Sequence, residues 1–341
     1  MRILILGGSE FVGRAFVDDA LARGWHVTTL NRQTRPPQPG VESLRGNRWE
    51  ARGLEELQGG HWDIAVDTWS WAPVAVRDAA AQLAESVGRY VYVSSRSVYQ
   101  MPLPAGATED APTVESSPGL TEAEYPQAKR GGELAALEHF GDRALLLRAG
   151  LIVGPNENIG RLPWWLNRAA DGGDMLGPGP ADQGLQYIDA RDLAAFGLDA
   201  AAAGLGGAYD VVSAPAATTM RDLLAACIVA TGSDARLHWV DPSVILEAGI
   251  EPWTQLPAWL PPGDLHETLH ESDTSKAFAA GLRIRPLAET VGDTWAWLQE
   301  IGGEAPQRGD RPRLGLDPAV EQRVLADQRF AETVSDLQRS E

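Results

Sequence analysis

A short apolar strand that runs directly into a glycine-rich turn and then a helix constrains the fold of this chain more than any other feature. Residues Arg2–Leu6 are almost continuously apolar, as strands buried on both faces of a parallel sheet are. The turn Gly7–Gly13 follows, and helical apolar spacing continues to Arg23. This order places backbone N–H groups and a helix N-terminus where the pyrophosphate of a dinucleotide binds. The sequence therefore predicts a doubly wound α/β parallel sheet of the Rossmann type, with a cofactor site at its first turn.

The glycine turn departs from the usual dinucleotide pattern at one position. Gly7 should permit the tight turn, and Gly13 should permit close packing of the helix on the strand. Glu10 stands where a middle glycine would let the backbone approach the phosphates. Because phosphates repel a carboxylate, Glu10 should point outward or meet a cation. An ordinary loop is the alternative interpretation. The residues predicted to contact the cofactor here are Gly7, Gly8, Ser9, Glu10, Phe11, Val12 and Gly13.

The end of the second predicted strand, His26–Leu30, bears on the choice of cofactor. An acidic residue at this point would hold the ribose 2′-hydroxyl of NAD(H), whereas an arginine suits the 2′-phosphate of NADP(H). The chain has Asn31 and Arg32 there, so NADP(H) is favoured over NAD(H). A solvated loop charge is the alternative for Arg32. Asn47 follows a short third strand, 41–45, and is predicted to contact adenine.

Two further predicted strands, 62–67 and 89–94, end at the same edge of the sheet, and a helix at 73–87 connects them. Open α/β sheets bind ligands at the carboxyl ends of their strands. The first of these strands should bring Asp67, Thr68 and Trp69 to the cofactor, and the second should bring Ser94 and Ser95 to the same edge.

A tyrosine and a lysine spaced by one helical turn supply the candidate chemistry. Tyr125 begins a helical run that continues to Phe140, and Lys129 follows four residues later, so both can face one cleft. An ammonium beside a phenol stabilises the phenolate, which makes the tyrosine a usable general acid or base. The pair alone is a weak signal, because exposed helical pairs with this spacing are common. The glycine turn and the serine-rich strand end at Val93–Tyr99 make the combination specific.

Bulk properties limit the classes of function. At 341 residues, with 44% hydrophobic residues, the chain can form a large core in two domains. A formal net charge of -18 argues against nucleic-acid binding. The lone cysteine, Cys227, cannot form an internal disulfide, which favours a reducing compartment. The chain shows neither a signal-peptide core nor an apolar run long enough to span a membrane, so we expect a cytoplasmic protein without a membrane partner.

Four ordered motifs resemble the extended short-chain dehydrogenase/reductase superfamily, in its NAD(P)-dependent epimerase/dehydratase branch. The resemblance covers most of the chain. The motifs beyond the glycine turn are Ser94–Tyr99, then Tyr125 with Lys129 and Glu133, and then Leu147–Pro155; the later Tyr187–Ala194 resembles the family's return into the sheet.

The resemblance implies a role for each matched residue. Ser95 would hydrogen-bond the substrate oxygen, Tyr125 would exchange its proton, and Lys129 would hold the nicotinamide ribose while favouring the phenolate. The backbone at Ala149, Gly150, Leu151 and Ile152 would meet the carboxamide. Hydride transfer would then accompany proton transfer by Tyr125.

Two departures from the family pattern bear on the predicted function. Family dehydratases carry an Asp-Glu pair directly after the active Ser or Thr, whereas this chain has Arg96 and Ser97, which argues against a dehydratase. Glu10 with Asn31 and Arg32 also resembles a divergent group that includes chloroplast RNA-binding relatives. A non-catalytic binding protein therefore stays open as an alternative.

After Pro155 the strand-helix alternation no longer repeats as a regular unit. This part of the chain is predicted to form a smaller lobe that selects the substrate. The predicted cofactor domain comprises residues 1–155 with 184–212, the α/β substrate lobe 156–183 with 213–300, and the linker with a C-terminal helix 301–341. That helix, Asp317–Arg339, could dock on the body, contact a partner subunit or be solvated; a homodimer is compatible with the sequence. The residues predicted to contact substrate are Arg96, Arg161, Trp164, Trp165 and Tyr187.

One zinc-like motif is set aside. His266-Glu-Thr-Leu-His270 fits a pattern that needs a helix, so that both imidazoles share a face, and a third ligand. Pro261 and Pro262 precede the motif, and Asp273 looks like the start of the next helix, so the segment is expected to be short and extended. We predict no metal.

These features favour an NADP(H)-dependent carbonyl reductase or alcohol dehydrogenase that acts on a small metabolite. A sugar or nucleotide-sugar epimerase that retains its nicotinamide cofactor is the second interpretation. Ser95, Tyr125 and Lys129 argue against the third, a cofactor-binding sensor that lost its chemistry.

Overall fold

The computed structural model describes residues 1–34, 36–50, 52–309 and 312–327. The chain divides into two compact units, which are described separately. The first consists of Met1–Ile152, Tyr187–Ala214 and Ser272–Ile284. The second consists of Val153–Gln186, Pro215–Glu271 and Arg285–Glu341. In the described part of the chain, the helices lack the combination of length and apolar character needed to cross a membrane.

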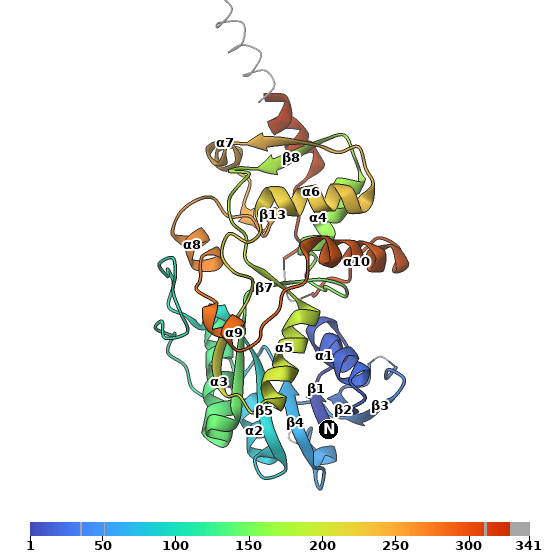
Figure 1. Cartoon of the computed structure of the whole chain (residues 1–341), viewed down its shortest axis with the longest axis vertical. Helices are drawn as coiled ribbons and strands as arrows, with labels where there is room; N and C mark the ends of the chain where they lie inside the picture. The colour runs from blue at the N-terminus through green and yellow to red at the C-terminus, as the bar shows by residue number, and fades with distance from the viewer. Residues whose placement is uncertain (35, 51, 310–311, 328–341) are drawn as a thin grey trace, which may run out of the picture. The chain divides into compact units, whose positions relative to one another are not determined.

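The first unit is built on a seven-stranded parallel sheet (Figure 1). Its strands are β1 Arg2–Leu6, β2 His26–Asn31, β3 Val41–Arg45, β4 Trp62–Asp67, β5 Val87–Ser95, β6 Ala144–Ala149 and β10 Gly207–Val211. The spatial order is β10-β6-β5-β4-β1-β2-β3. The order reverses beside β1, so the glycine turn lies at the topological switch point where such sheets bind dinucleotides. The predicted fold class is confirmed.

Helices cover both faces of this sheet. They are α1 Phe11–Ala22, α2 Pro73–Leu83, α3 Tyr125–Phe140 and α5 Ala190–Ala202, with the short helices η1 Glu55–Leu57, η2 Arg96–Val98, η3 Gly141–Arg143 and α9 Ser275–Ala279. The side chains of β1 alternate between two buried clusters: Ile3 and Ile5 pack with α1 and α5, whereas Leu4 and Leu6 pack with α2 and α3. This period of two explains why the strand is apolar at nearly every position.

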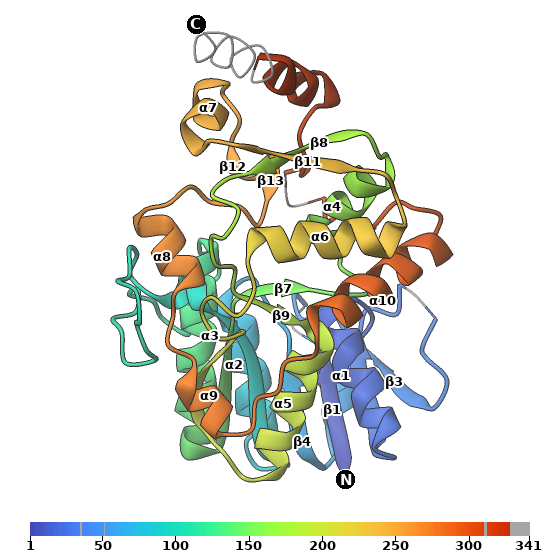
Figure 2. The ribbon, with the colours of Figure 1, turned by 45° about the horizontal axis from the view of Figure 1, so that its top comes forward.

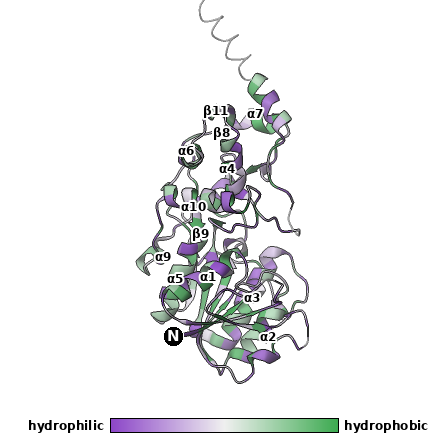
Figure 3. Cartoon of the chain, turned by 90° about the vertical axis from the view of Figure 1, so that its right-hand side faces the viewer, coloured by the Kyte–Doolittle hydropathy of each residue, from purple (hydrophilic) through white to green (hydrophobic). Residues whose placement is uncertain are grey.

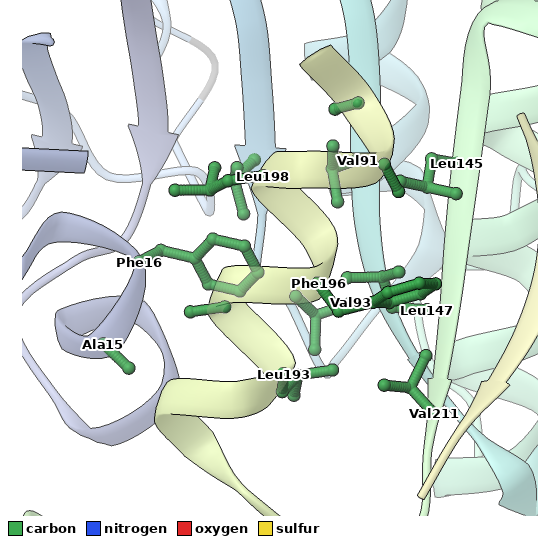
Figure 4. Close-up of a cluster of buried hydrophobic side chains, with 14 of the residues drawn as sticks. Ala15, Phe16, Val91, Val93, Leu145, Leu147, Leu193, Phe196, Leu198 and Val211 are labelled. Carbon is green, nitrogen blue, oxygen red and sulfur yellow. The ribbon is translucent and has the colours of Figure 1, made fainter. Parts of the chain in front are cut away.

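The layer between α1, α5 and the sheet is densely packed (Figure 4). Phe16 of α1, Leu193 of α5 and the strand residues Val91, Leu145 and Val211 belong to one cluster of buried side chains. A side chain at Gly197 of α5 would come within 2.8 Å of Leu147 and 3.0 Å of Phe16, so this glycine lets α5 approach the sheet. In the hydropathy colouring of Figure 3 the strands of the sheet are largely green, as this burial requires.

Two segments of the first unit differ from the predicted organisation. The chain does not rejoin the sheet at Tyr187: β9 Tyr187–Asp189 pairs with β7 Leu151–Val153 in a separate two-stranded sheet, and the chain returns only at β10. Ser272–Ile284, predicted in the substrate lobe, belongs to the first unit. The physical reason is burial, because Ala277 and Leu282 enter the core of the sheet and Lys276 Nζ donates to the Ala208 carbonyl at 2.7 Å.

The second unit combines small sheets with a helical layer. Strand β8 Asp174–Pro178 pairs in parallel with β11 Arg236–Val240, and β12 Pro252–Trp253 pairs with β13 Leu256–Pro257. The helices are α4 Arg161–Ala170, α6 Met220–Thr231, α7 Pro242–Glu247, α8 Asp264–His270 and α10 Leu287–Glu300. Figure 2 shows β8 and β11 side by side, and α6 packs against both α4 and α10.

The C-terminal helix docks on the second unit, which answers one question that the sequence left open. Residues 318–327 are helical, and Glu321 accepts hydrogen bonds from Arg168 Nε at 2.7 Å and from the Leu176 N–H at 2.8 Å. Val324 and Leu325 are buried. The remainder of the predicted helix, from residue 328, lies outside the described residues.

We expect Glu321→Ala to lower the free energy of unfolding by about 2 kcal/mol, because it leaves the largely buried Arg168 guanidinium and the Leu176 N–H without this carboxylate. Urea denaturation would measure the change. Asp327→Ala, at an exposed position on the same helix, is the control and should change stability by less than about 0.5 kcal/mol. Equal stability of the two variants would contradict the docking role of Glu321.

Candidate active site

The glycine turn has the backbone geometry that the sequence predicts. Gly7 and Gly8 have φ values of +123° and +93°, which side-chain-bearing residues rarely adopt. A Cβ at Gly13 would lie 2.7 Å from the Gly8 nitrogen, so the first turn of α1 packs directly on the turn's backbone. A dinucleotide pyrophosphate fits such a cradle, because backbone N–H groups and a helix N-terminus face it without intervening side chains.

Glu10 lies at the start of α1. It is the N-cap residue of α1, its side chain is exposed, and it makes no side-chain capping hydrogen bond. Ser9 is also exposed, whereas Phe11 and Gly13 are buried and Val12 is half-buried. The expectation that Glu10 points outward or meets a cation stays a prediction.

Asn31 and Arg32 lie beside the glycine turn at the end of β2. The Asn31 side-chain amide donates to the Gly7 carbonyl at 3.5 Å, and its oxygen accepts the Gln33 N–H at 2.7 Å. Arg32 is exposed. The residues at this strand end therefore include an accessible guanidinium and lack the carboxylate that would favour a 2′-hydroxyl.

Asp67 was predicted to contact the cofactor, and this prediction is wrong. The residue is fully buried, and Arg48 donates to both of its carboxylate oxygens, at 2.6 and 2.9 Å. Tyr90 also donates to it, at 2.5 Å. A carboxylate at the end of an apolar strand needs a buried cation, which was the available signal for Arg48. Asn47, predicted to contact adenine, instead accepts the Trp49 N–H at 3.2 Å and donates to Glu50.

Thr68 and Trp69 connect the end of β4 to the turn and to the candidate chemistry. Thr68 Oγ1 donates to the Leu6 carbonyl at 3.1 Å, immediately before the turn. The Trp69 indole N–H donates to the Ala72 carbonyl at 3.0 Å. The Trp69 carbonyl accepts from Lys129 Nζ at 2.7 Å and from the Tyr92 hydroxyl at 3.1 Å.

Lys129 is held between two strand ends. Its side chain is buried, and Nζ donates to the Trp69 carbonyl after β4 and to the Val93 carbonyl of β5, each at 2.7 Å. It also lies 5.0 Å from the centroid of the Tyr92 ring. These contacts fix the ammonium at the carboxyl edge of the sheet, two residues from Ser95 along β5.

Tyr125 and Ser95 lie on the elements that frame Lys129. Tyr125 is half-buried and is the first residue of α3, one turn before Lys129. Ser95 ends β5, and its Oγ accepts the Ser97 N–H at 3.1 Å. Helix α3 packs against both β5 and η2, so the elements that carry the three residues are neighbours.

A buried network of charges lies beside these residues and explains two further corrections. Ser94 Oγ donates to Glu133 at 2.8 Å, and Glu133 binds Arg148 through both oxygens at 2.8 and 3.0 Å. Ser94 is therefore part of the interior and does not face the cofactor. Arg96, predicted to contact substrate, is likewise buried and bonds Asp210 at 3.3 Å.

Tyr99 joins the two halves of this network. Burial raises the pKa of Tyr99 well above its usual value, so its hydroxyl stays protonated and donates to Asp210 at 2.7 Å. The same hydroxyl accepts from Arg148 at 3.0 Å. Arg148 interrupts the apolar run of β6, which was the sequence signal for a buried ion pair.

The segment predicted to meet the carboxamide lies at the end of β6. Ala149 is the last residue of that strand, and Leu151 and Ile152 belong to β7. A Cβ at Gly150 would come within 2.7 Å of Val212, so this position needs glycine for packing. The contact with a carboxamide stays a prediction.

The other candidate substrate residues are mostly interior. Trp165 is buried and its indole N–H donates to the Pro257 carbonyl at 2.7 Å, and Tyr187 is buried in β9, so both predictions are wrong. The Trp165 ring is buried in the second unit and the Tyr187 ring in the first. Trp164 is half-buried and packs against Gly315, and the Arg161 guanidinium lies 5.4 Å from the Trp253 ring centroid.

The zinc-like segment is a helix, contrary to the extended structure predicted. His266 and His270 are both buried on α8, and their rings lie 5.2 Å apart. His266 Nε2 bonds the Gly184 carbonyl at 2.8 Å, and His270 Nδ1 accepts the Gln186 N–H at 3.1 Å. These bonds tie α8 to the chain before β9. Among the described residues, no cluster of three or more His, Cys, Asp or Glu side chains could hold a metal ion.

Glu157 is a buried carboxyl that the sequence interpretation missed. It precedes α4 and accepts hydrogen bonds from the N–H groups of Arg161 at 2.6 Å and Leu162 at 3.3 Å. Burial raises the pKa of Glu157 to about 7, and the Arg161 charge and the backbone donors only partly oppose this shift.

These features define a Rossmann-fold protein with the residue pattern of the extended short-chain dehydrogenase/reductase class. Residues 70–211 match the model of the NAD dependent epimerase/dehydratase family. This match agrees with the family resemblance that the sequence motifs carry, and it supports an NAD(P)-dependent enzyme.

Curated relatives and solved structures agree with this family. A dTDP-4-dehydro-6-deoxy-D-allose reductase of Streptomyces bikiniensis is 28% identical, over 56% of this chain and 69% of that protein. A 2-alkyl-3-oxoalkanoate reductase of Stenotrophomonas maltophilia (strain K279a) is 28% identical, over 68% of this chain and 76% of that protein. The structure of UDP-glucuronic acid 4-epimerase from Bacillus cereus in complex with NAD has a TM-score of 0.64 at 13% identity, over 88% of this chain and 99% of that chain. At this identity the last comparison shows the fold alone.

We expect the raised pKa of Glu157 to make stability fall as pH rises from about 4.5 to about 7, because the folded chain keeps a proton there that the unfolded chain releases. Glu157→Gln removes this titration. Between about pH 5 and about pH 8, wild type should therefore lose on the order of 2 kcal/mol more stability than the variant. Urea denaturation at each pH measures the difference, with Glu300→Gln at an exposed position as control. Parallel pH profiles for wild type and Glu157→Gln would contradict it.

Proposed function

We propose that the chain is an NADP(H)-dependent oxidoreductase that transfers hydride to or from a carbonyl or alcohol carbon of a small metabolite. The anchoring of Lys129 carries this proposal. Its Nζ bonds the carbonyls of Trp69 and Val93, at the carboxyl ends of β4 and β5, with Tyr125 one helical turn before it. An ammonium fixed at the ligand-binding edge beside a phenol is the arrangement that general acid catalysis by tyrosine needs.

The glycine turn supports nicotinamide dinucleotide binding, since its first two glycines adopt positive φ values and its last admits no Cβ. The bound nicotinamide would supply or accept the hydride. Gly7, Gly8 and Gly13 would hold the pyrophosphate, and Thr68 and Trp69 would line the path between the turn and Lys129.

The roles of the chain's own residues follow from their chemistry. Ser95 would orient the substrate oxygen through its hydroxyl, and Tyr125 would give a proton to that oxygen as negative charge develops on it. Lys129 would stabilise the phenolate that remains. In the oxidative direction each transfer reverses.

The preference for NADP(H) depends on Arg32. This residue follows β2, is exposed, and has no carboxylate beside it at the strand end where a 2′-hydroxyl would bind one. The compared Bacillus cereus epimerase carries NAD, so the cofactor must be tested directly.

Reductase activity is favoured because both curated relatives are named as reductases of carbonyl compounds. A 4-dehydro-6-deoxysugar nucleotide and a 2-alkyl-3-oxoalkanoate are thus the first substrate classes to test. Sugar or nucleotide-sugar epimerisation is the second candidate, because the family model that matches residues 70–211 is that of the NAD dependent epimerase/dehydratase family. Stoichiometry separates the two: a reductase consumes one NADPH per turnover, whereas an epimerase consumes none.

We expect Tyr125→Phe to lower the turnover rate by about 10²-fold or more, because the transferable proton is lost. The dissociation constant for NADPH should stay within about twofold of the wild-type value. NADPH absorbance with a panel of carbonyl compounds measures the first quantity and fluorescence titration the second. Tyr209→Phe, a variant of another tyrosine in the first unit, is the control. Full activity in Tyr125→Phe would remove the proposed acid.

We expect Arg32→Ala to weaken NADPH binding by about 10-fold or more and NADH binding little, because only NADPH has the phosphate that a guanidinium would bind. Arg52→Ala removes the same charge from another exposed arginine and should leave both dissociation constants unchanged. A loss that is equal for NADPH and NADH would argue against the 2′-phosphate contact.

A further inference from the structure

A second tyrosine lies beside the buried ammonium of the candidate active site. Tyr92 belongs to β5, three residues before Ser95, and its side chain is fully buried on the face of the sheet that α2 and α3 cover. Lys129 Nζ lies over its ring, 5.0 Å from the centroid. An ammonium within about 6 Å of a ring centroid is attracted by the negative face of the ring, most strongly where water is excluded. Tyr92 therefore stabilises the charged form of Lys129.

The hydroxyl of Tyr92 acts on the same ammonium through a shared acceptor. It donates to the Trp69 carbonyl at 3.1 Å, and Lys129 Nζ donates to the same oxygen at 2.7 Å. The Trp69 N–H is held from the other side, because it donates to Asp67 at 2.9 Å. The backbone of Trp69 is thus fixed on both sides, and the carbonyl that Lys129 needs keeps its direction.

Helix α3 has a glycine where the Tyr92 ring requires space. A Cβ at Gly132 would lie 2.3 Å from the Tyr92 hydroxyl oxygen and 2.5 Å from Cζ, so a side chain at this position would displace the ring. Gly132 follows Lys129 by three residues and therefore lies on the same face of the helix. One face of α3 thus presents the ammonium and the space for the ring side by side.

The charged groups around Tyr92 keep its own hydroxyl protonated. Burial raises the pKa of Tyr92 well above its usual value, and negative charge on Asp67, Tyr125 and Glu133 raises it further. Asp67 and Glu133 are each bound by an arginine. Tyr92 therefore stays a neutral ring beside the ammonium, and Tyr125, half-buried at the start of α3, is the phenol that exchanges a proton in the proposed function.

We propose that Tyr92 is a positioning residue for proton transfer by Tyr125. Its ring face holds the Lys129 ammonium charged and in place, so a phenolate at Tyr125 forms at lower pH than it would without the ring. This inference rests on the proposed function, and it assigns Tyr92 no contact with substrate or cofactor. Weakening the negative face of the ring should therefore raise the pH at which Tyr125 ionises, even where the shape of the side chain is kept.

The test replaces Tyr92 by phenylalanine and, in a separate protein, by 3,4,5-trifluorophenylalanine. Fluorine withdraws electron density from the ring face with little change in shape, so the two proteins differ mainly in their attraction for the ammonium. The tyrosines carry ¹³C at Cζ, NMR follows their ionisation as pH rises, and Tyr125→Phe identifies the Tyr125 signal. We expect fluorination to raise the ionisation midpoint of Tyr125 by about half a pH unit, and Tyr92→Leu to raise it by about one unit.

Lys276 and Tyr209 form a matched control pair in the same unit. Lys276 Nζ lies 4.8 Å from the Tyr209 ring centroid and donates to a backbone carbonyl, as Lys129 does. This pair belongs to α9 and β10, so it is not part of the proposed site. The same two replacements at position 209 should leave the ionisation midpoint of Tyr125 unchanged. Thermal melting verifies that each variant is folded.

Turnover gives a readout that a merely structural role would not move. Oxidation needs the phenolate of Tyr125, so the fluorinated protein should be about threefold slower than Tyr92→Phe below the midpoint and should recover the same rate at higher pH. A loss that is equal at every pH would indicate a structural role and would contradict the proposal.

The outcomes distinguish this inference from the proposed function. If fluorination leaves the Tyr125 midpoint unchanged while Lys129→Met raises it, the role of Tyr92 is wrong and the oxidoreductase proposal stands. If Lys129→Met also leaves the midpoint unchanged, the ammonium does not act on Tyr125 and both proposals fail. In a Lys129→Met background fluorination should have no effect, because its route to Tyr125 is gone. An effect that persists there would show that the ring acts on Tyr125 directly and would overturn the positioning role.

Discussion

The buried ammonium of Lys129 is the interaction on which the candidate active site depends. A buried lysine is unfavourable unless strong acceptors surround its charge, and here the carbonyls of Trp69 and Val93 each accept at 2.7 Å. These bonds join three elements: α3, which begins with Tyr125, the end of β5, which presents Ser95, and the loop after β4, which carries Trp69. Displacing the end of β5 or the loop after β4 would cost the ammonium one of these two bonds, and displacing α3 would break both. The proposed proton transfer therefore depends on all three elements.

A second layer of buried charge makes that support rigid. Glu133 lies one turn beyond Lys129 on α3, and it joins Ser94 of β5 to Arg148 of β6. Tyr99 extends the network from Arg148 to Asp210 of β10. Satisfied buried networks of this kind favour one arrangement of the strands over alternatives, since a shift of one strand leaves charges unpaired. Helix α3 is therefore tied to three strands through side chains as well as through packing, which keeps Tyr125 and Lys129 in register with Ser95.

Local patterns predicted the fold well, whereas pairings between distant residues were not predictable. Helix α3 begins at Tyr125 and ends at Phe140, as the sequence predicts. The glycine turn predicted from Gly7 and Gly13 has the expected positive φ at Gly7 and the expected tight packing at Gly13. Each such feature depends on residues close in sequence. Asp67, Arg96 and Trp165 were misassigned for the opposite reason: a charged or aromatic residue near a strand end or helix start suggests a ligand, and only the tertiary structure shows the buried partner that already satisfies it. The helix at His266–His270 formed despite the preceding prolines because tertiary hydrogen bonds to Gly184 and Gln186 hold both imidazoles.

The same pairings reconcile an acidic chain with an anionic cofactor. With a net charge of -18, carboxylates exposed at the carboxyl edge of the sheet would repel a pyrophosphate. Three buried acids of the first unit are instead neutralised inside it: Asp67 of β4 by Arg48, Glu133 of α3 by Arg148, and Asp210 of β10 by Arg96. Glu10 remains exposed at the start of α1, whose first backbone N–H groups would be available to the phosphates. Backbone donors and Arg32 are then left to meet the ligand, so the recognition proposed here uses groups that the internal ion pairs leave available.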